Sequence, residues 1–366
     1  MPVSVAAAVL RSLEEQFTLE TLSLDEPGED EVLVKVTATG ICHTDIKVSR
    51  GYANVPLPVV LGHEGAGIIE RTGKGVTGFA AGDHVVLTFP SCGQCAPCIS
   101  SHPAYCDQGQ VLSFQCSSMP LHGNGGAVHG GFFGQSSFAT HALCRVDNVV
   151  KVDSSLPLEK LGPLGCGFQT GAGAVLNVMQ PVPGQSLAVF GSGNVGLSAV
   201  MAARIAGMNP VIALDVSPDR LAMAASLGAT HVLDLTTNQD PVASIHALVK
   251  GGVNYALDTI NHPPLVRQAF ESLANRGTCI HSGGGGKDLC FPGSHLLHGR
   301  TITGVIQGDS DPKSFIPQLI DYYREGRFPF DRLLTFYELA QINQAVEDME
   351  AGKVIKPVLR MPESLA

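Results

Sequence analysis

The sequence lacks the features that direct a chain to nucleic acid or across a membrane. Its 23 Lys and Arg residues are outnumbered by 33 Asp and Glu and form no cluster, which argues against a polyanionic partner. No run reaches the roughly 20 apolar residues that a membrane-spanning helix needs. The N-terminus, MPVSVAAAVLRSLEEQ, has no basic region before a long apolar core, so we expect no signal peptide and a cytoplasmic protein.

Charged residues are also scarce, at 15%, whereas hydrophobic residues make up 44% of the 366 positions. A chain of this length and composition buries a sizeable core and has room for two domains. Glycine is abundant, with 42 residues, which indicates many tight turns and close backbone approaches. We therefore expect a globular protein with a sizeable core, and this composition says nothing about small ligands.

Four cysteines in one short stretch carry the clearest signal. Cys92, Cys95, Cys98 and Cys106 lie in CGQCAPCISSHPAYC, with the spacing C-x2-C-x2-C-x7-C. Four thiolates complete the tetrahedral coordination of Zn²⁺ and leave no position for a substrate. We predict a structural zinc that holds a loop, so the chemistry must lie elsewhere. Unrelated buried thiols or a disulfide pair is the alternative.

The pattern of predicted elements changes along the chain. Residues 1–150 contain short strands such as EVLVKVTATG and DHVVLTF between turns, as in a partly closed barrel or sandwich. Within them, residues 107–137 are rich in Gly and Ser, and we expect a long loop there. From about residue 160, strands alternate with helices, which predicts a parallel, doubly wound α/β sheet. The tail from about 306 should return to the first domain.

A glycine-rich turn follows the apolar strand LAVF. Gly191, Gly193 and Gly196 have the G-x-G-x-x-G spacing, in which the glycines permit a tight turn, close approach of a pyrophosphate and packing of the next helix. The backbone N–H groups of Asn194 and Val195 at the start of that helix should face the phosphates. The sequence thus predicts a dinucleotide site.

Asp215 ends the next strand, 19 residues after Gly196. An acid at this place accepts hydrogen bonds from the adenosine ribose and repels a 2′-phosphate, which favours NAD over NADP. A plain turn with a solvated aspartate is the alternative.

A second set of metal-ligand residues lies in glycine-rich strand–turn junctions. Cys42 lies in GICHTD, His63 and Glu64 lie in GHEGAG, and Cys166 lies in GPLGCGFQTGAG. Two thiolates and one imidazole with an open fourth position form the ligand set of a catalytic zinc. Each residue taken alone is more easily interpreted as a small buried cysteine or a core histidine. Their joint occurrence favours the metal.

With these motifs in this order, the chain resembles the zinc-dependent medium-chain alcohol dehydrogenases over essentially its whole length. The segments VLTFPSCGQC, GGFFGQSSFAT and LGPLGCGFQTGAGAVLN are most similar to bacterial aryl-alcohol (benzyl-alcohol) dehydrogenases. The resemblance implies a GroES-like β-barrel catalytic domain at 1–165, a Rossmann NAD-binding domain at 166–305 and a return to the catalytic domain at 306–366. It also implies two zincs per chain, NAD, an alcohol or aldehyde substrate, and a homodimer or homotetramer.

The resemblance also implies roles at the catalytic site. Three residues would ligate the catalytic zinc: Cys42, His63 and Cys166. Glu64 matches an acid that can transiently ligate the metal, Asp45 matches the acid that orients the ligand histidine, and Thr44 matches the hydroxyl that touches the alcohol. The family often has a histidine as the outer end of a proton relay where this chain has Lys47.

Further residues match positions that face the cofactor. His43 and Lys356 match residues that face the pyrophosphate, Arg220 matches a basic residue near the adenosine ribose, and Thr170 matches a residue near the nicotinamide. These roles come from the resemblance alone.

The substrate is less closely defined. Phe132, Phe133 and Phe138 of GGFFGQSSF either line an apolar pocket for aromatic or allylic primary alcohols or belong only to the core. Two other functions stay open: a zinc dehydrogenase for terpenoid or aliphatic primary alcohols, and an NAD-binding zinc protein without turnover.

Overall fold

The computed structural model describes residues 2–116, 119, 121–123, 126–282 and 288–362. They belong to two compact units. The first unit comprises Met1–Cys166, Asp311–Gln318 and Asp331–Ala366, and the second comprises Gly167–Ser310 and Leu319–Phe330.

Two mainly antiparallel sheets form the first unit. One has the order β4-β1-β2-β7-β8, with the bounds Val59–Val60, Val3–Leu10, Thr18–Leu24, Leu121–Gly123 and Gly126–Val128. The other has the order β10-β6-β5-β3-β18-β17, with the bounds Val149–Lys151, His84–Leu87, Gly65–Thr72, Glu31–Gly40, Lys356–Arg360 and Leu334–Glu338, and β9 (His141–Arg145) pairs with β3. The mostly β character expected for residues 1–150 is confirmed.

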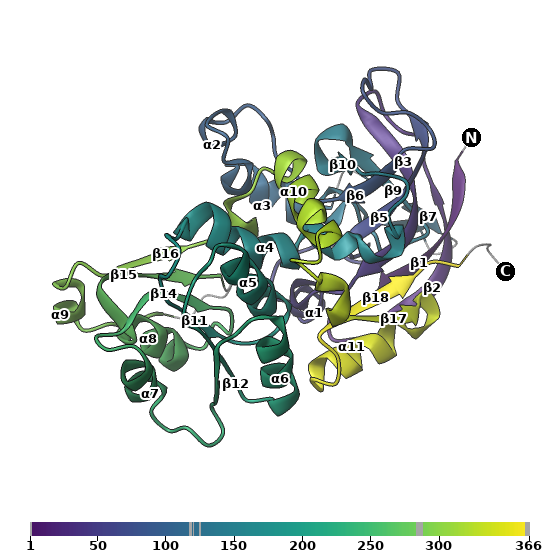
Figure 1. The fold of residues 1–366 in the computed structure, drawn as a ribbon. Helices are drawn as coiled ribbons and strands as arrows, with labels where there is room; N and C mark the ends of the chain where they lie inside the picture. The colour runs from purple at the N-terminus through teal and green to yellow at the C-terminus, as the bar shows by residue number, and fades with distance from the viewer. Residues whose placement is uncertain (1, 117–118, 120, 124–125, 283–287, 363–366) are drawn as a thin grey trace. The chain divides into compact units, whose positions relative to one another are not determined.

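The C-terminal strands join a sheet built from the N-terminal half of the chain. β18 pairs antiparallel with β3, so that Val358 lies opposite Gly40 and Arg360 lies opposite Ala38. In Figure 1 the yellow strands β17 and β18 accordingly lie among strands from the start of the chain. This pairing carries Lys356, the first residue of β18, to the end of β3.

Short helices complete the first unit. They are α1 (His43–Ser49), α2 (Ala96–Ile99), α3 (Gly109–Phe114) and α11 (Ile342–Glu350). α3 and the short hairpin of β7 and β8 lie within residues 107–137, where we expected only a loop. That expectation is wrong for these described residues; residues 117–118, 120 and 124–125 lie outside them. The Gly- and Ser-rich composition gives no local signal for these short elements. Contacts with distant strands stabilise them: β7, for example, pairs with β2.

The second unit contains a six-stranded sheet in the order β13-β12-β11-β14-β15-β16. The bounds of these strands are His231–Asp234, Val211–Asp215, Leu187–Phe190, Val253–Asp258, Leu273–His281 and Thr301–Gly304. Every pairing is parallel, and the residues of β11 are all buried, as a continuous apolar run in a parallel sheet predicts. The expected doubly wound sheet is confirmed. Of the glycine run after β15, residues 283–287 lie outside the described residues.

The second unit also contains the helices α4 (Gly167–Gly173), α5 (Asn194–Ile205), α6 (Pro218–Leu227), α7 (Pro241–Leu248), α8 (Pro263–Glu271) and α9 (Gly293–Leu296). The helices expected after the glycine turn and after Ser217 are α5 and α6. For α6, the Ser217 hydroxyl accepts a hydrogen bond from the Arg220 N–H, and Pro218 occupies the first helical position, which is a favourable start for a helix.

The boundary after the parallel sheet differs from our expectation. We placed all of residues 306–366 with the first unit, but Leu319–Phe330 belongs to the second, and the division falls within α10 (Pro312–Arg324). The physical reason is an aromatic cluster. Phe328 and Phe330 are fully buried, and the ring of Phe330 packs against Phe168 of the second unit at 5.3 Å between centroids.

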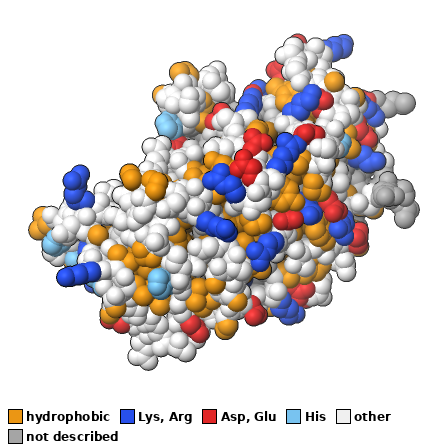
Figure 2. Space-filling model, viewed as in Figure 1, with side chains coloured by type: hydrophobic (Ala, Val, Ile, Leu, Met, Phe, Trp, Pro, Cys, Tyr) orange, Lys and Arg blue, Asp and Glu red, His pale blue; other side chains and the backbone are white. Residues whose placement is uncertain are grey.

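Basic and acidic side chains are intermixed on the face shown in Figure 2, where no broad basic area is visible among the described residues. No helix in the described ranges combines the length and apolar character needed to cross a bilayer.

Candidate functional site

The four cysteines of the lobe converge in the first unit. The sulfur atoms of Cys92, Cys95, Cys98 and Cys106 all lie within 4.8 Å of one another, and all four are free thiols rather than disulfides. Backbone N–H groups point at the sulfurs: Cys92 donates to Cys106 Sγ at 3.2 Å. Hydrogen bonds from the N–H groups of Gln94 and Cys95 lower the pKa of Cys92 to about 6. The arrangement fits a closed site with four sulfur ligands.

A second donor group lies in the same unit. One ligand atom from each of Cys42, His63, Glu64 and Cys166 falls within 4.8 Å of the others. Cys42 precedes α1, His63 and Glu64 lie in the turn between β4 and β5, and Cys166 follows a short 3-10 helix, Gly162–Gly165. Three separate parts of the chain thus bring the predicted ligands together.

Glycines allow these segments to approach so closely. A Cβ added at Gly162 would lie 2.2 Å from the carbonyl oxygen of Glu64, and one at Gly40 would lie 2.0 Å from Glu64 Oε2. Both separations are far below van der Waals contact. The glycine-rich junctions in the sequence therefore have a packing role at this site.

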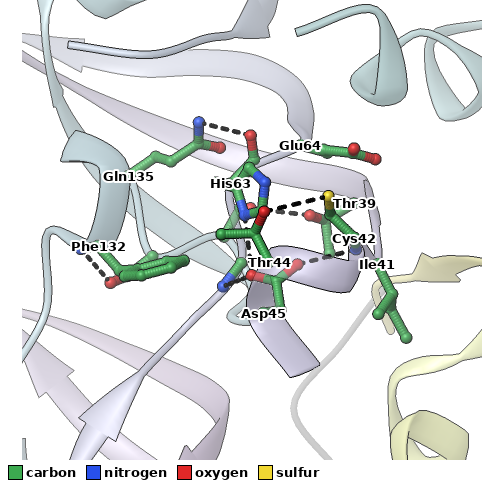
Figure 3. Close-up of polar contacts among 12 residues, drawn as sticks. Thr39, Ile41, Cys42, Thr44, Asp45, His63, Glu64, Phe132 and Gln135 are labelled. Carbon is green, nitrogen blue, oxygen red and sulfur yellow. Dashed lines mark hydrogen bonds and ion pairs between the residues drawn. The ribbon is translucent and has the colours of Figure 1, made fainter. Parts of the chain in front are cut away.

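Asp45 fixes the orientation of the His63 imidazole. Its Oδ1 lies 2.9 Å from His63 Nδ1, and both side chains are 1% exposed. The same carboxylate accepts the backbone N–H groups of Cys42, at 2.9 Å, and Gly62, at 3.2 Å. Figure 3 shows Asp45 at the start of α1 beside the imidazole. With Nδ1–H directed to Asp45, Nε2 carries the free lone pair.

The hydrogen bonding of the donor group fits a bound metal ion, and its close contacts shift the pKa values of its members. His63 Nε2 is buried and has no hydrogen-bond partner among the described residues, which is costly unless another group binds there. A hydrogen bond from Cys166 lowers the pKa of Cys42 well below its ordinary value, and the same contact raises that of Cys166. Burial would lower the pKa of His63, but Asp45 outweighs it and raises the pKa well above the ordinary value.

Lys356 occupies a different environment from the one we expected. Its side chain is fully buried, and Nζ lies 2.9 Å from each carboxylate oxygen of Glu64. It also donates to the carbonyl oxygen of Ile41 at 3.0 Å. An ammonium group has three donors, and these acceptors use all three. The assignment of Lys356 to the cofactor pyrophosphate is therefore wrong in this structure; the lysine instead neutralises and holds Glu64.

Two further predicted residues lie on α1. The Thr44 hydroxyl is 3.7 Å from Cys42 Sγ and is drawn next to the donor group in Figure 3. The side chain of His43 is exposed. His43 and Thr44 are the first two residues of α1, directly after its N-cap Cys42, so the start of the helix places both side chains.

The glycine turn in the second unit is open where a dinucleotide would approach. Gly191 has φ 97°, and Gly193 is the N-cap residue directly before α5. A Cβ at Gly193 would meet nothing within 4 Å, whereas one at Gly196 would lie 1.8 Å from the carbonyl oxygen of Gly191. Within the part of the chain that the structure describes, the buried Ser192 Oγ and Asn194 Nδ2 have no hydrogen-bond partner. These unpaired groups at a helix N-terminus fit a pyrophosphate.

Asp215 and Arg220 lie beside this turn. Asp215 Oδ2 accepts the N–H of Ser192 at 2.7 Å, and Oδ1 accepts the N–H groups of Val216 and Ser217. The carboxylate therefore also holds the glycine turn, which the sequence did not reveal. Arg220 Nε is buried and without a partner in the described ranges. Thr170, partly exposed, lies in α4 of the same unit.

Sequence reasoning missed Gln135. This side chain is fully buried and bonds to the two peptide groups that flank Glu64, donating to the His63 carbonyl at 3.0 Å (Figure 3) and accepting the Gly65 N–H at 3.0 Å. A glutamine in a Gly/Ser-rich segment has no local pattern that marks it.

Comparison with known proteins matches both units. The profile of the alcohol dehydrogenase GroES-like domain matches residues 28–154, and that of the zinc-binding dehydrogenase matches residues 194–323. The chain is 45% identical over 365 residues to a geraniol dehydrogenase of Castellaniella defragrans, with 98% of each protein covered.

Solved structures agree. An alcohol dehydrogenase zinc-binding domain protein from Burkholderia ambifaria is 48% identical, with a TM-score of 0.97 and coverage of 99% of this chain and 100% of that one. The benzyl alcohol dehydrogenase of Acinetobacter calcoaceticus is 44% identical, with a TM-score of 0.95 and coverage of 98% and 100%.

Proposed function

The chain belongs to the zinc-dependent medium-chain alcohol dehydrogenases, and from this premise we propose that it oxidises aromatic or allylic primary alcohols to aldehydes with NAD. The observation that carries the proposal is the donor group of Cys42, His63 and Cys166, in which the buried His63 Nε2 has no hydrogen-bond partner within the described part of the chain. Three protein ligands leave a fourth position for substrate. The NAD-binding protein without turnover, one of the alternatives, gives no reason for such an open position.

The residues of the chain have separate tasks in this reaction. Cys42, His63 and Cys166 would hold a zinc ion that would supply Lewis acidity, and the glycine turn of the second unit would hold NAD, which would supply the hydride acceptor. Asp45 keeps the His63 imidazole in one orientation. Lys356 holds the Glu64 carboxylate through both of its oxygens. Thr44 accepts the alcohol proton and passes it on towards solvent.

Of the three candidate pocket phenylalanines, Phe133 is the one that supports a role in substrate binding. Phe132 and Phe138 are fully buried core residues, whereas Phe133 is partly exposed and stacks on the His63 ring at 4.6 Å between centroids. Its exposed part offers an apolar, aromatic surface next to the donor group. Geraniol and benzyl alcohol, named in the relatives, are an allylic and an aromatic primary alcohol.

Benzyl alcohol and geraniol should be better substrates than ethanol. At ~0.8 kcal/mol per buried methylene equivalent, the larger apolar contact predicts a kcat/KM roughly 100-fold above that of ethanol. The rate of NADH formation with each of the three alcohols is the test of the proposed function. Phe133→Ala should reduce the benzyl alcohol to ethanol ratio, and Phe336→Ala, which changes another half-buried phenylalanine, should not. Equal values for ethanol and benzyl alcohol would contradict the substrate class.

NAD should be preferred to NADP, because a 2′-phosphate would face the carboxylate of Asp215. Asp215→Gly should lower the NAD to NADP ratio of kcat/KM by about tenfold, which corresponds to ~1.4 kcal/mol. Since this variant also removes the acceptor of the Ser192 N–H, KM should rise for both cofactors. Asp219→Asn removes a charge from an exposed neighbour and should leave the ratio unchanged. Equal use of NAD and NADP by the unsubstituted enzyme would argue against the assignment.

We further propose a cytoplasmic homodimer or homotetramer. All ten cysteines are free thiols, which suits a reducing compartment. β16 is the edge strand of the parallel sheet and is mostly exposed, so that it offers unpaired backbone groups to a second copy.

A further inference from the structure

Residues 131–137, which follow the four-cysteine lobe in the sequence, have an unusual backbone. Four of these residues have left-handed dihedral angles: Gly131 (φ 82°), Phe133 (φ 49°), Gly134 (φ 66°) and Ser136 (φ 47°). For the two that are not glycine, this conformation is unfavourable, because the side chain crowds the backbone. Such a backbone persists only where surrounding contacts hold it.

Those contacts connect the segment to the turn that carries the metal ligands. The Ser136 hydroxyl donates to the carbonyl oxygen of Val60 at 2.6 Å, directly before the turn. The Ser137 N–H donates to the Gly62 carbonyl at 3.0 Å. The ring of Phe133 lies parallel to the His63 ring within 24°. The strained segment is therefore fixed against the ligand turn.

Gln135 makes the central contact of this set. Its Nε2 donates to the carbonyl oxygens of His63, at 3.0 Å, and Thr88, at 3.2 Å, while Oε1 accepts the Gly65 N–H at 3.0 Å. Both amide donors and the carbonyl acceptor are thus used. The side chain is 0% exposed, so water does not compete for these bonds.

We propose that Gln135 is a positioning residue for the catalytic metal site: it holds the two peptide groups that flank Glu64, directly after His63, so that the ligand atoms keep the spacing that zinc requires. The proposal rests on the proposed function, since it concerns the same donor group. Asp45 fixes the edge of the imidazole ring, but it does not fix the carbonyl group of His63. Gln135 fixes that carbonyl, and removing the bonds would leave buried groups of the turn unpaired.

The retention of zinc tests this proposal without relying on turnover. Gln135→Met keeps the size of the side chain but removes all three hydrogen bonds. The release of zinc from the purified enzyme to a coloured chelator should follow two kinetic phases, one for each donor group. The phase that is absent in Cys166→Ser is the component from the catalytic site. In Gln135→Met this component should be about 10–100-fold faster, while the component from the four-cysteine lobe should not change.

Asn343 provides a matched control. Its side-chain amide also bridges a backbone in the first unit, donating to the Phe17 carbonyl at 2.9 Å and accepting the Phe17 N–H at 2.9 Å. Asn343→Leu removes a bridge of the same kind away from the donor group. It should leave both zinc-release components as they are in the unsubstituted enzyme, whatever it does to the melting temperature.

A second variant keeps the test decisive if Gln135→Met does not fold. Gln135→Glu retains an acceptor for the Gly65 N–H but places an acceptor oxygen against the His63 carbonyl, so it should also release the catalytic zinc faster. Unchanged release in a folded variant, or equal acceleration in Asn343→Leu, would overturn the role of Gln135 while alcohol oxidation by the unsubstituted enzyme still supports the proposed function. An unsubstituted enzyme without a zinc component that depends on Cys166 would overturn both.

Discussion

Cys166→Ser should remove one zinc per chain and nearly all alcohol oxidation, whereas Cys98→Ser should remove the other zinc and mainly lower stability. The two cysteines belong to separate donor groups, each with its ligand atoms within 4.8 Å of one another. A catalytic zinc supplies several kcal/mol of charge stabilisation, so kcat/KM should fall by roughly 1,000-fold or more in Cys166→Ser. Metal analysis of the purified variants and NADH formation give the two readouts.

The opposite result is expected for Cys98→Ser. A closed site with four sulfurs has no position for substrate, and its loss should lower the free energy of unfolding by roughly 2–4 kcal/mol, measured by denaturant unfolding. The residual folded enzyme should retain its active-site residues and part of its activity. Cys144→Ala is the control, because this buried thiol belongs to neither donor group; it should leave two zincs per chain. If Cys98→Ser and Cys166→Ser behaved alike, the division between structural and catalytic metal would be wrong.

Much of the architecture and both donor groups could be predicted because their signals are local. The cysteines of the lobe lie within 15 consecutive residues, and the glycine turn at Gly191 lies between an apolar strand and a helix. Each ligand of the second group stands in its own short glycine-rich motif. Local spacing and strand–helix alternation decide such features, and they do not require knowledge of long-range contacts.

The features that were missed depend on contacts between distant parts of the chain. Lys356 is separated by 292 positions from Glu64, whose carboxylate it holds, and a lysine is rarely expected at 0% exposure. Gln135 reaches the His63 carbonyl across 72 positions. Leu319–Phe330 joined the second unit because of aromatic packing that no helical periodicity indicates. In each case tertiary packing, rather than propensity, decided the outcome.

Removing the Thr44 hydroxyl should cost most of the activity, whereas removing the Lys47 side chain should cost little. Thr44 lies in the first turn of α1, with its hydroxyl 3.7 Å from Cys42 Sγ, so it can reach a hydroxyl bound at the donor group. Thr44→Val keeps the shape of the side chain and removes only the proton acceptor. General acid–base catalysis contributes about 10²–10⁴-fold, and kcat should fall within that range at pH 7.

Lys47 is the residue to compare with Thr44, because both lie on α1. From the resemblance described above, position 47 is where a relay histidine would be expected. Its side chain is exposed, and Nζ lies over the Tyr52 ring at 5.9 Å from the centroid. A charged ammonium has no lone pair to accept a proton. Lys47→Ala should therefore change kcat by less than about threefold, which corresponds to under ~0.7 kcal/mol.

Thr44→Ser separates loss of the hydroxyl from disturbance of the helix. It retains the O–H at the same position, so it should recover most of the activity that Thr44→Val loses, while zinc content stays at two per chain in both variants. Single-turnover hydride transfer, compared with steady-state kcat, shows whether the loss lies in the chemical step. If Lys47→Ala were as damaging as Thr44→Val, Lys47 would either accept the proton itself or anchor the cofactor. Either result would contradict the expectation that the reaction needs no particular residue at position 47.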